Sequence, residues 1–171
     1  MKYLQFLFFL ILTLLLVRCS DDEDISVKPS PLDLPVITGF QVRDYNGSVH
    51  SVYGSPNIKL RDRSEESGST LYFSVYPNPV EEYCSVYTDI PNNDAERHLW
   101  IVPAIYQGDE PPSYSDMGMI NFSAEGTPVI DITFTTEYYR LNLSDLETGF
   151  YKVYLEVENS ILNDNLVIIH K

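Results

Sequence analysis

Cys19 is the residue whose position in the sequence most clearly implies chemistry. It follows a 14-residue apolar segment from Leu4 to Val17, which is preceded by a single lysine at position 2. A spanning helix needs about 20 apolar residues, so this shorter segment is typical of a secretory signal. An ordinary signal peptide ends in small residues, whereas here a cysteine stands directly at the expected cleavage point.

The residues Leu16-Val17-Arg18-Cys19 resemble the lipobox of bacterial lipoprotein signal peptides, with Arg18 departing from the family's Gly, Ala or Ser. In that family the cysteine thiol, a strong nucleophile, receives a diacylglyceryl group, and the new amino terminus is acylated after cleavage. The resemblance implies that residues 1–18 are a signal peptide and that Cys19 carries acyl chains such as palmitate. The alternative is a plain signal peptide with an incidental cysteine.

The sequence "SDDED" from Ser20 to Asp24 resembles the export signal of Bacteroidetes-type lipoproteins that reach the outer face of the outer membrane. This resemblance implies a lipid-anchored protein exposed at the cell surface. Ser26 to Pro35 contains three prolines and no periodicity, which is typical of a semi-stiff tether. We therefore expect residues 19–35 to be an acidic, proline-rich tether, with a reach of at most about 60 Å between Ser20 and Ile37.

A second set of residues has the oxygen ligands that calcium prefers. They lie in the loop-like stretch "DIPNNDAE", and the candidate ligands are Asp89, Asn92, Asp94 and Glu96. Their spacing is not that of an EF-hand loop, and turns are rich in Asn and Asp for backbone reasons. Calcium and an ordinary turn both remain open here, and we expect no other metal site or cofactor.

Catalytic motifs are absent from the sequence, which has no HExxH, GxSxG, glycine-rich phosphate loop or CxxC. His50, His98 and His170 lack partners at metal-binding or triad spacing, and we expect His50 and His98 at the surface or a sheet edge. Tyrosines offer a non-catalytic alternative, because exposed rings could stack on sugars or pair across strands. The candidates for such a glycan platform are Tyr106, Tyr114, Tyr138 and Tyr139.

The charge balance limits the possible partners. Without residues 1–18 the chain keeps 9 basic and 25 acidic side chains, a net charge of −16, which disfavours nucleic acid and anionic lipid headgroups. After modification of Cys19 only Cys84 is left, so no intramolecular disulfide is possible, and we expect Cys84 to be a small buried hydrophobe.

Apolar residues alternate with polar ones in most segments after the tether, which is the pattern of half-buried strands. Asn46-Gly47 between two such segments is a strong hairpin signal. The run from Leu99 to Ile105, with Trp100, indicates a central strand. Further strands are expected at 71–75, 130–134, 151–157 and 166–169, and a long loop between Gly108 and Pro128. With no sustained helical pattern, residues 36–171 are predicted to form one all-β, immunoglobulin-like antiparallel sandwich.

Two further segments resemble the C-terminal sorting domains of type IX secretion cargo in Bacteroidetes. "VYPNP" matches the opening motif of those domains through Pro77, Asn78 and Pro79. "LNLSDLETGFYKVYLEV" matches their L-x-x-G-x-Y hairpin through Leu146, Gly149 and Tyr151. The resemblance covers residues 76–171 and implies either shared immunoglobulin-like architecture or a working sorting signal. Prolines also end strands, so a purely structural role is equally compatible with these residues.

These observations predict a surface-anchored, non-enzymatic lipoprotein with a binding or structural role at the outer membrane. Its ligand is expected to be a glycan or an envelope protein. The alternative is a sorting or assembly module of the type IX secretion pathway.

Overall fold

The computed structural model describes residues 34–64, 67–108 and 127–170, which contain twelve strands and no helix. The predicted signal peptide with Cys19, nearly all of the tether, Tyr114 and most of the predicted loop after Gly108 lie outside these residues. None of the described residues forms a helix with the length and hydropathy of a membrane span.

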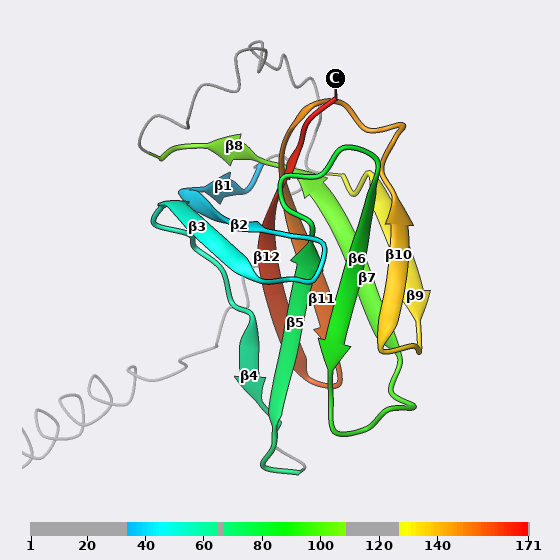
Figure 1. The fold of residues 1–171 in the computed structure, drawn as a ribbon. Helices are drawn as coiled ribbons and strands as arrows, with labels where there is room; N and C mark the ends of the chain where they lie inside the picture. Colours follow the sequence, from blue (N-terminus) through cyan, green and yellow to red (C-terminus); the bar gives the residue numbers. More distant parts are fainter. Residues whose placement is uncertain (1–33, 65–66, 109–126, 171) are drawn as a thin grey trace, which may run out of the picture.

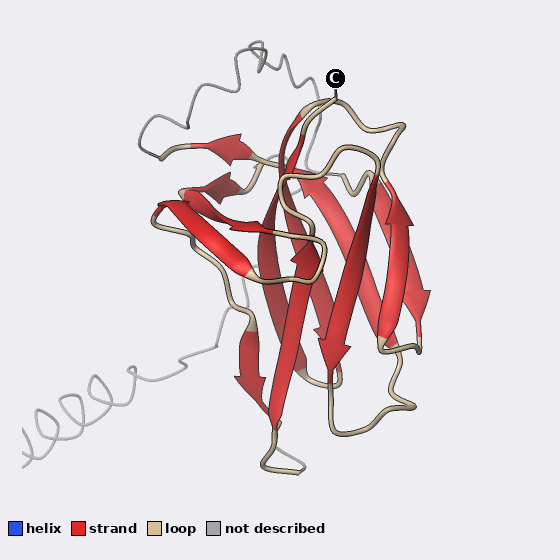
Figure 2. Ribbon diagram, in the orientation of Figure 1, coloured by secondary structure: helices blue, strands red, loops and turns tan. Residues whose placement is uncertain are grey.

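Two four-stranded antiparallel sheets form the body of the domain (Figure 1). Sheet I has the order β10 (Tyr138–Asn142), β6 (Tyr83–Asp89), β5 (Thr70–Tyr76) and β4 (Arg61–Arg63). Sheet II has the order β12 (Ser160–Ile168), β11 (Gly149–Val157), β7 (Arg97–Pro103) and β9 (Ile130–Phe134). Strands dominate the described chain, and loops connect them at both ends of the sheets (Figure 2).

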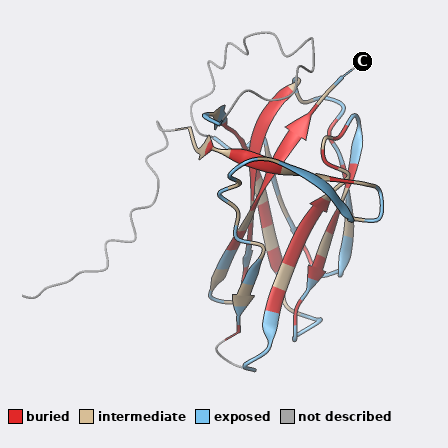
Figure 3. Ribbon diagram, turned by 60° about the vertical axis from the view of Figure 1, so that its left-hand side comes forward, coloured by how far each residue is buried: buried red, intermediate tan, exposed pale blue. Residues whose placement is uncertain are grey.

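The alternating residues that predicted the strands meet in one core between the sheets. Sheet I supplies Leu71, Phe73 and Val86, whereas sheet II supplies Leu99 and Val153, and all five are buried. Figure 3 shows that buried residues recur along the strands of both sheets. Burial of these side chains at about 25 cal/mol per Å² is the main force that holds the sheets together.

The chain crosses between the sheets from β6 to β7, from β9 to β10 and from β10 to β11. Strands β5, β6 and β10 therefore face β9, β7, β11 and β12, which is the arrangement of an immunoglobulin-like sandwich. The predicted all-β sandwich is confirmed, and β7 is central as expected because it lies between β11 and β9.

A third layer, the hairpin layer, is built mainly from residues that precede β4, together with residues 105–106. The β2 (Gly39–Arg43) and β3 (Val49–Gly54) hairpin turns at Asn46-Gly47, as the sequence predicts, and β1 (Val36–Ile37) pairs in parallel with β8 (Ile105–Tyr106). Phe40 of this layer packs in a second apolar cluster with Phe150 and Val167 of sheet II. The layer thus covers part of the outer side of sheet II.

A buried polar network fixes this layer to the sandwich. The guanidinium group of Arg43 donates to Asp164, and both side chains are about 1% exposed. Arg43 also donates to the carbonyl oxygen of Val75 at 2.9 Å, while the amide nitrogen of Val75 donates to Asp164 Oδ2 at 3.2 Å. One ion pair therefore ties β2, β5 and β12 together.

Strand β12 differs from its prediction. It begins at Ser160 instead of Leu166, because the polar residues Asn163, Asp164 and Asn165 continue the strand. Asp164 and Asn165 are buried, and their bonding groups are satisfied by residues far away in the sequence. A polar stretch can therefore lie inside the sandwich.

Candidate functional site

The outer face of sheet I is the most distinctive surface among the described residues. In β5 the side chains of Leu71, Phe73 and Val75 are buried in the core, so the alternate residues Tyr72 and Tyr76 point outward. The same alternation in β6 and β10 adds further outward residues. Together the outward aromatic and basic residues of these strands and β4 are Arg61, Arg63, Tyr72, Tyr76, Tyr83, Tyr87, Tyr138 and Arg140.

Three of these tyrosines form a row across the sheet. The ring centroids of Tyr72 and Tyr87 are 5.9 Å apart, and those of Tyr87 and Tyr138 are 4.8 Å apart. Arg61 extends the row, because its guanidinium carbon lies 5.2 Å from the centroid of Tyr72. Such contacts stabilise aromatic and cationic side chains at a surface and hold the row in place.

Two tyrosine hydroxyl groups of this face, those of Tyr76 and Tyr87, have a raised pKa. Burial raises the pKa of Tyr76, and the neighbouring Tyr138 and Tyr72 add to the effect. Burial likewise raises the pKa of Tyr87, with smaller contributions from Asp89 and Glu137. A neutral hydroxyl group both donates and accepts hydrogen bonds, so Tyr76 and Tyr87 can bond to polar ligands without phenolate charge.

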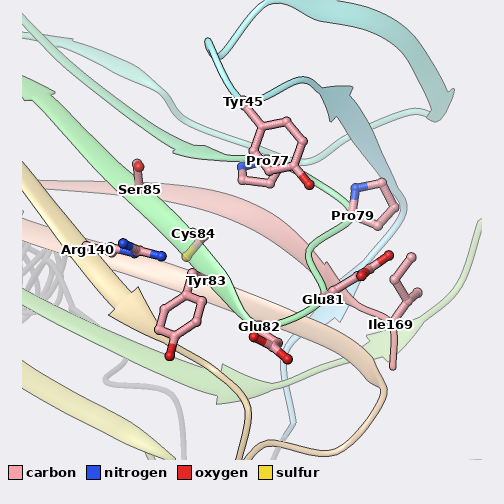
Figure 4. A pocket seen from close by; sticks show the side chains of 10 residues that line it. All are labelled: Tyr45, Pro77, Pro79, Glu81, Glu82, Tyr83, Cys84, Ser85, Arg140 and Ile169. Atoms are coloured by element: carbon pink, nitrogen blue, oxygen red, sulfur yellow. The ribbon is translucent and has the colours of Figure 1, made fainter. Parts of the chain in front are cut away.

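A pocket of about 370 Å³ lies at one end of this face (Figure 4). Arg140 and Tyr83 form one side of the pocket, where the guanidinium carbon of Arg140 lies 4.3 Å from the ring centroid of Tyr83. Tyr45 and Pro77 lie toward another side. The complete lining consists of Tyr45, Pro77, Pro79, Glu81, Glu82, Tyr83, Cys84, Ser85, Arg140 and Ile169.

The β2–β3 hairpin supplies one wall of the pocket. Its turn residue Gly47 has a φ of +80°, and a Cβ atom there would lie 3.1 Å from the ring of Tyr76. The turn therefore packs closely on the outer face of sheet I, next to Tyr45. The hairpin begins at Gly39 and β6 begins at Tyr83, so the pocket is completed by a segment that is distant in the sequence.

Cys84 is buried, as the sequence predicts, although it contributes to the pocket lining. Burial raises the pKa of its thiol to about 12. The thiolate is the reactive form of cysteine, so this thiol is unreactive at neutral pH.

The structure gives the "VYPNP" residues a packing role. Asn78 is fully buried between Pro77 and Pro79, and both X-Pro bonds are cis. Its side-chain amide donates to the carbonyl oxygens of Gln41 at 2.8 Å and Asn165 at 2.9 Å. Its Oδ1 accepts the amide N–H of Val167 at 2.9 Å. Asn78 therefore joins the hairpin layer to β12, while the two prolines line the pocket.

The "LETGFY" residues form a tyrosine corner. Tyr151 is buried in the core, and its hydroxyl group donates to the carbonyl oxygen of Glu147 at 2.7 Å. Gly149 begins β11 and Leu146 packs against the core. A tyrosine near the start of this strand, bonded to the backbone a few residues upstream, is a hallmark of immunoglobulin-like sandwiches. The sorting role of these residues stays a prediction.

The proposed calcium ligands lie at the end of β6 and in the turn that follows it. Asp89 ends β6, and Asn92, Asp94 and Glu96 lie in or beside the following turn. Arg97 donates to the carbonyl oxygens of Asn93 and Ala95, at 3.3 and 2.7 Å. Among the residues that the structure describes, no three His, Cys, Asp or Glu side chains are grouped to hold a metal ion. Calcium at this turn stays a prediction.

The three histidines occupy separate places. His50 Nε2 lies 3.1 Å from Asp44, and His170 Nε2 lies 2.6 Å from the carbonyl oxygen of Leu146. His98 is on the outer face of sheet II, where its hydrogen bond to Asp131 raises its pKa. His50 is exposed and His98 is partly exposed, so both lie at the surface, as predicted.

Of the four tyrosines proposed as a glycan platform, the three that the structure describes do not lie together. Tyr106 stacks on Phe150 in the hairpin layer, with ring centroids 4.5 Å apart. Tyr139 stacks on Phe134, with ring centroids 4.9 Å apart. Tyr114 lies outside the described residues, and of the other three only Tyr138 belongs to the tyrosine row.

The sequence contained a signal for the observed face. Tyr72 and Tyr76, and likewise Tyr83 and Tyr87, are four residues apart within alternating strands, and this spacing puts both members on one face. No local sequence pattern predicts that Tyr45 lines the pocket, because the position of its side chain depends on where the hairpin packs.

The fold and its tyrosine-rich face define an all-β, immunoglobulin-like sandwich with a surface pocket. No protein-family model matches the chain, and no curated protein does so either. Among solved structures, the chain is similar to the crystal structure of the PmoD soluble domain from Methylocystis sp. ATCC 49242 (Rockwell). The TM-score is 0.38 and the identity 9%, over 66% of this chain and 99% of that one.

Proposed function

We propose that this chain is a non-enzymatic binding protein and that lipid on Cys19 anchors it to the outer surface of the outer membrane. Its ligand, a glycan or an envelope protein, binds to the outer face of sheet I. Nucleic acid is not a ligand, because the strong negative charge of the chain repels phosphate.

The observation that carries this proposal is the row of Tyr72, Tyr87 and Tyr138 beside the pocket. Tyrosine and arginine are the side chains that most often dominate binding energies at interfaces. The row needs no rearrangement to present its rings, since the strands fix it, and a preorganised surface loses less entropy on binding.

The proposed lipid and the tether determine how far this face can lie from the membrane. Residues 19–35 precede the first strand, and an extended chain reaches up to about 3.5 Å per residue. The sandwich can therefore stand clear of the membrane surface. With its face directed away from the bilayer, the domain would present the tyrosine row to molecules outside the cell.

Protease treatment of intact cells tests the location. Wild-type protein is expected to be degraded from the cell surface and to fractionate with the outer membrane. Cys19→Ala is expected to be protected from the protease and to leave the membrane fraction. Cys84→Ala, which alters the buried thiol, serves as the matched control and is expected to behave like the wild type. Surface exposure and membrane retention of Cys19→Ala would refute the proposal.

A further inference from the structure

We propose that the pocket between the hairpin tip and the start of β6 binds one uncharged sugar residue of a glycan chain. This inference rests on the proposed binding function and names the ligand class. The tyrosine row beside the pocket would then contact neighbouring sugar residues of the same chain.

The size of the pocket fits a small ring. Its volume of about 370 Å³ lies at the lower end of the range for small-molecule sites, about 300–1,000 Å³. A flat protein–protein interface does not need such a concavity, whereas a sugar ring that projects from a chain fills one. The pocket therefore favours a glycan over a protein as the ligand.

The charges of the lining favour an uncharged polyol. Arg140 supplies only donors, and the carboxylates of Glu81 and Glu82 supply only acceptors. A sugar hydroxyl group both donates and accepts, so one ring can satisfy both kinds of group. An anionic ligand would meet two carboxylates against one guanidinium group, so the net charge of the lining disfavours it.

Aromatic and proline rings supply the apolar part of the site. Tyr45 is 81% exposed although it is an aromatic residue, so the fold itself makes little use of its ring. The close packing of Gly47 on Tyr76 holds the hairpin tip near the pocket. Tyr83, across the pocket, is 42% exposed, with Arg140 over its ring. The C–H face of a sugar ring can pack against such aromatic rings, while its hydroxyl groups bond to the charged residues.

The outer face of sheet I extends the proposed binding site beyond the pocket. Ser85 and Arg140 line the pocket and are also register partners on adjacent strands β6 and β10. Tyr87 lies two residues further along β6 on the same face, directly opposite Tyr138. A glycan chain that leaves the pocket along β6 therefore meets the tyrosine row next.

Affinity electrophoresis of the purified full-length protein in detergent tests the inference. The gels contain one neutral polysaccharide each, namely xylan, mannan, dextran or a β-glucan, and a separate gel contains anionic polygalacturonate. We expect at least one neutral polymer to retard the wild type. Tyr83→Ala and Tyr45→Ala should each weaken this binding about tenfold, the effect of losing roughly 1.4 kcal/mol of aromatic contact.

Tyr154→Ala is the matched control, because Tyr154 lies on the outer face of sheet II, where it stacks on Trp100. It should bind like the wild type. Tyr45→Ala keeps the test decisive if Tyr83→Ala misfolds, since the exposed Tyr45 ring contributes little packing. The inference is wrong if no neutral polymer retards the protein, if only polygalacturonate does, or if both pocket variants bind normally. The protease experiment on intact cells tests the lipid anchor and does not depend on sugar binding. A failure of the proposed anchor and a failure of the glycan inference therefore give different results.

Discussion

The side chain of Asn78 links three backbone groups that belong to different parts of the molecule. It bonds to Gln41 in the hairpin and to Asn165 and Val167 in β12. Asparagine fits this place because its amide has two donors and one acceptor oxygen in a fixed plane. The resemblance of "VYPNP" to a sorting motif thus has a structural explanation in this chain, whether or not the motif also acts in secretion.

Asn78→Ala is therefore expected to lower the free energy of unfolding by about 3 kcal/mol, because it leaves buried backbone groups without partners. Urea unfolding measures the change. Asn93→Ala, in an exposed turn, is the control and should alter stability by less than about 0.5 kcal/mol. Equal stability of Asn78→Ala and the wild type would mean that these three bonds contribute nothing.

Lys152 gives the fold a specific dependence on pH. Its ammonium group is buried and donates to the side chain of Asn165 at 2.7 Å and to the backbone carbonyl of Asn57. Burial lowers its pKa from 10.5 to about 8, although the nearby Asp164 acts in the opposite direction. Between these two pH values the unfolded chain binds more protons at this residue than the folded chain does.

It follows that the contribution of Lys152 to stability increases as the pH rises from about 8 to 10.5. The comparison is the unfolding free energy of the wild type minus that of Lys152→Met, measured at intervals from pH 7 to pH 10. The difference should shift in favour of the wild type across this window. A difference that stays constant with pH would contradict the lowered pKa.

The β2–β3 hairpin is the element that converts an open sheet face into a pocket. Its tip packs on Tyr76, its strand β2 carries Arg43 into the buried ion pair, and Tyr45 lines the pocket wall. The position of the hairpin is thus fixed at two separate points. We expect a change at the tip to disturb both the stability of the fold and the pocket.

Gly47→Ala tests the packing of the tip. Gly68→Ala is a close control, because Gly68 also has a positive φ, +67°, but only the end of the Arg63 side chain lies near its Cβ position, at 3.7 Å. Both changes force alanine into the left-handed region at a cost of about 1 kcal/mol. Gly47→Ala should destabilise the protein further in urea unfolding, because its Cβ meets the Tyr76 ring. Equal losses would show that the tip does not pack there.

The sequence predicts those elements whose signals are local. Alternation at Leu71, Phe73 and Val75 places β5, and Asn46-Gly47 places the hairpin turn. The first half of β12 could not be predicted in this way, because the buried Asp164 is paired with Arg43, 121 residues away in the sequence, and with the amide of Val75. The pocket is equally non-local, and of the tyrosines that seemed suitable by type, Tyr106 and Tyr139 stack on Phe150 and Phe134 instead.

The boundaries of the sorting-domain resemblance do not coincide with those of the sandwich. The resemblance starts at Tyr76, the last residue of β5, yet sheet I needs β5 between β6 and β4. The Arg43–Asp164 pair likewise joins a residue before this segment to one inside it. The described part of the chain therefore uses residues on both sides of position 76 for one core.

A reporter fusion distinguishes the sorting alternative from the binding function. Residues 36–171, which include the hairpin and both sheets, are placed behind a periplasmic reporter in a bacterium with the type IX pathway. Because the motif residues serve packing in this structure, we expect the reporter to stay in the periplasm. Secretion of the reporter, with loss of secretion on Gly149→Ala or Tyr151→Phe, would instead establish the sorting module.

The whole molecule combines an acidic surface, a proposed lipid anchor and one tyrosine-rich face. A chain with 25 acidic and 11 basic side chains is not attracted to an anionic membrane by charge, so in this proposal the lipid supplies the attachment. Two or more acyl chains give stable anchoring, whereas a single one is marginal. The proposed location thus depends on the modification of one sulfur atom.

Mass spectrometry of the amino-terminal peptide from the protein purified out of membranes tests this claim most directly. The account predicts a peptide that begins at Cys19 and carries a thioether-linked diacylglyceryl group together with an acylated amino terminus. A peptide with an unmodified Cys19, or a mature chain that begins elsewhere, would contradict it.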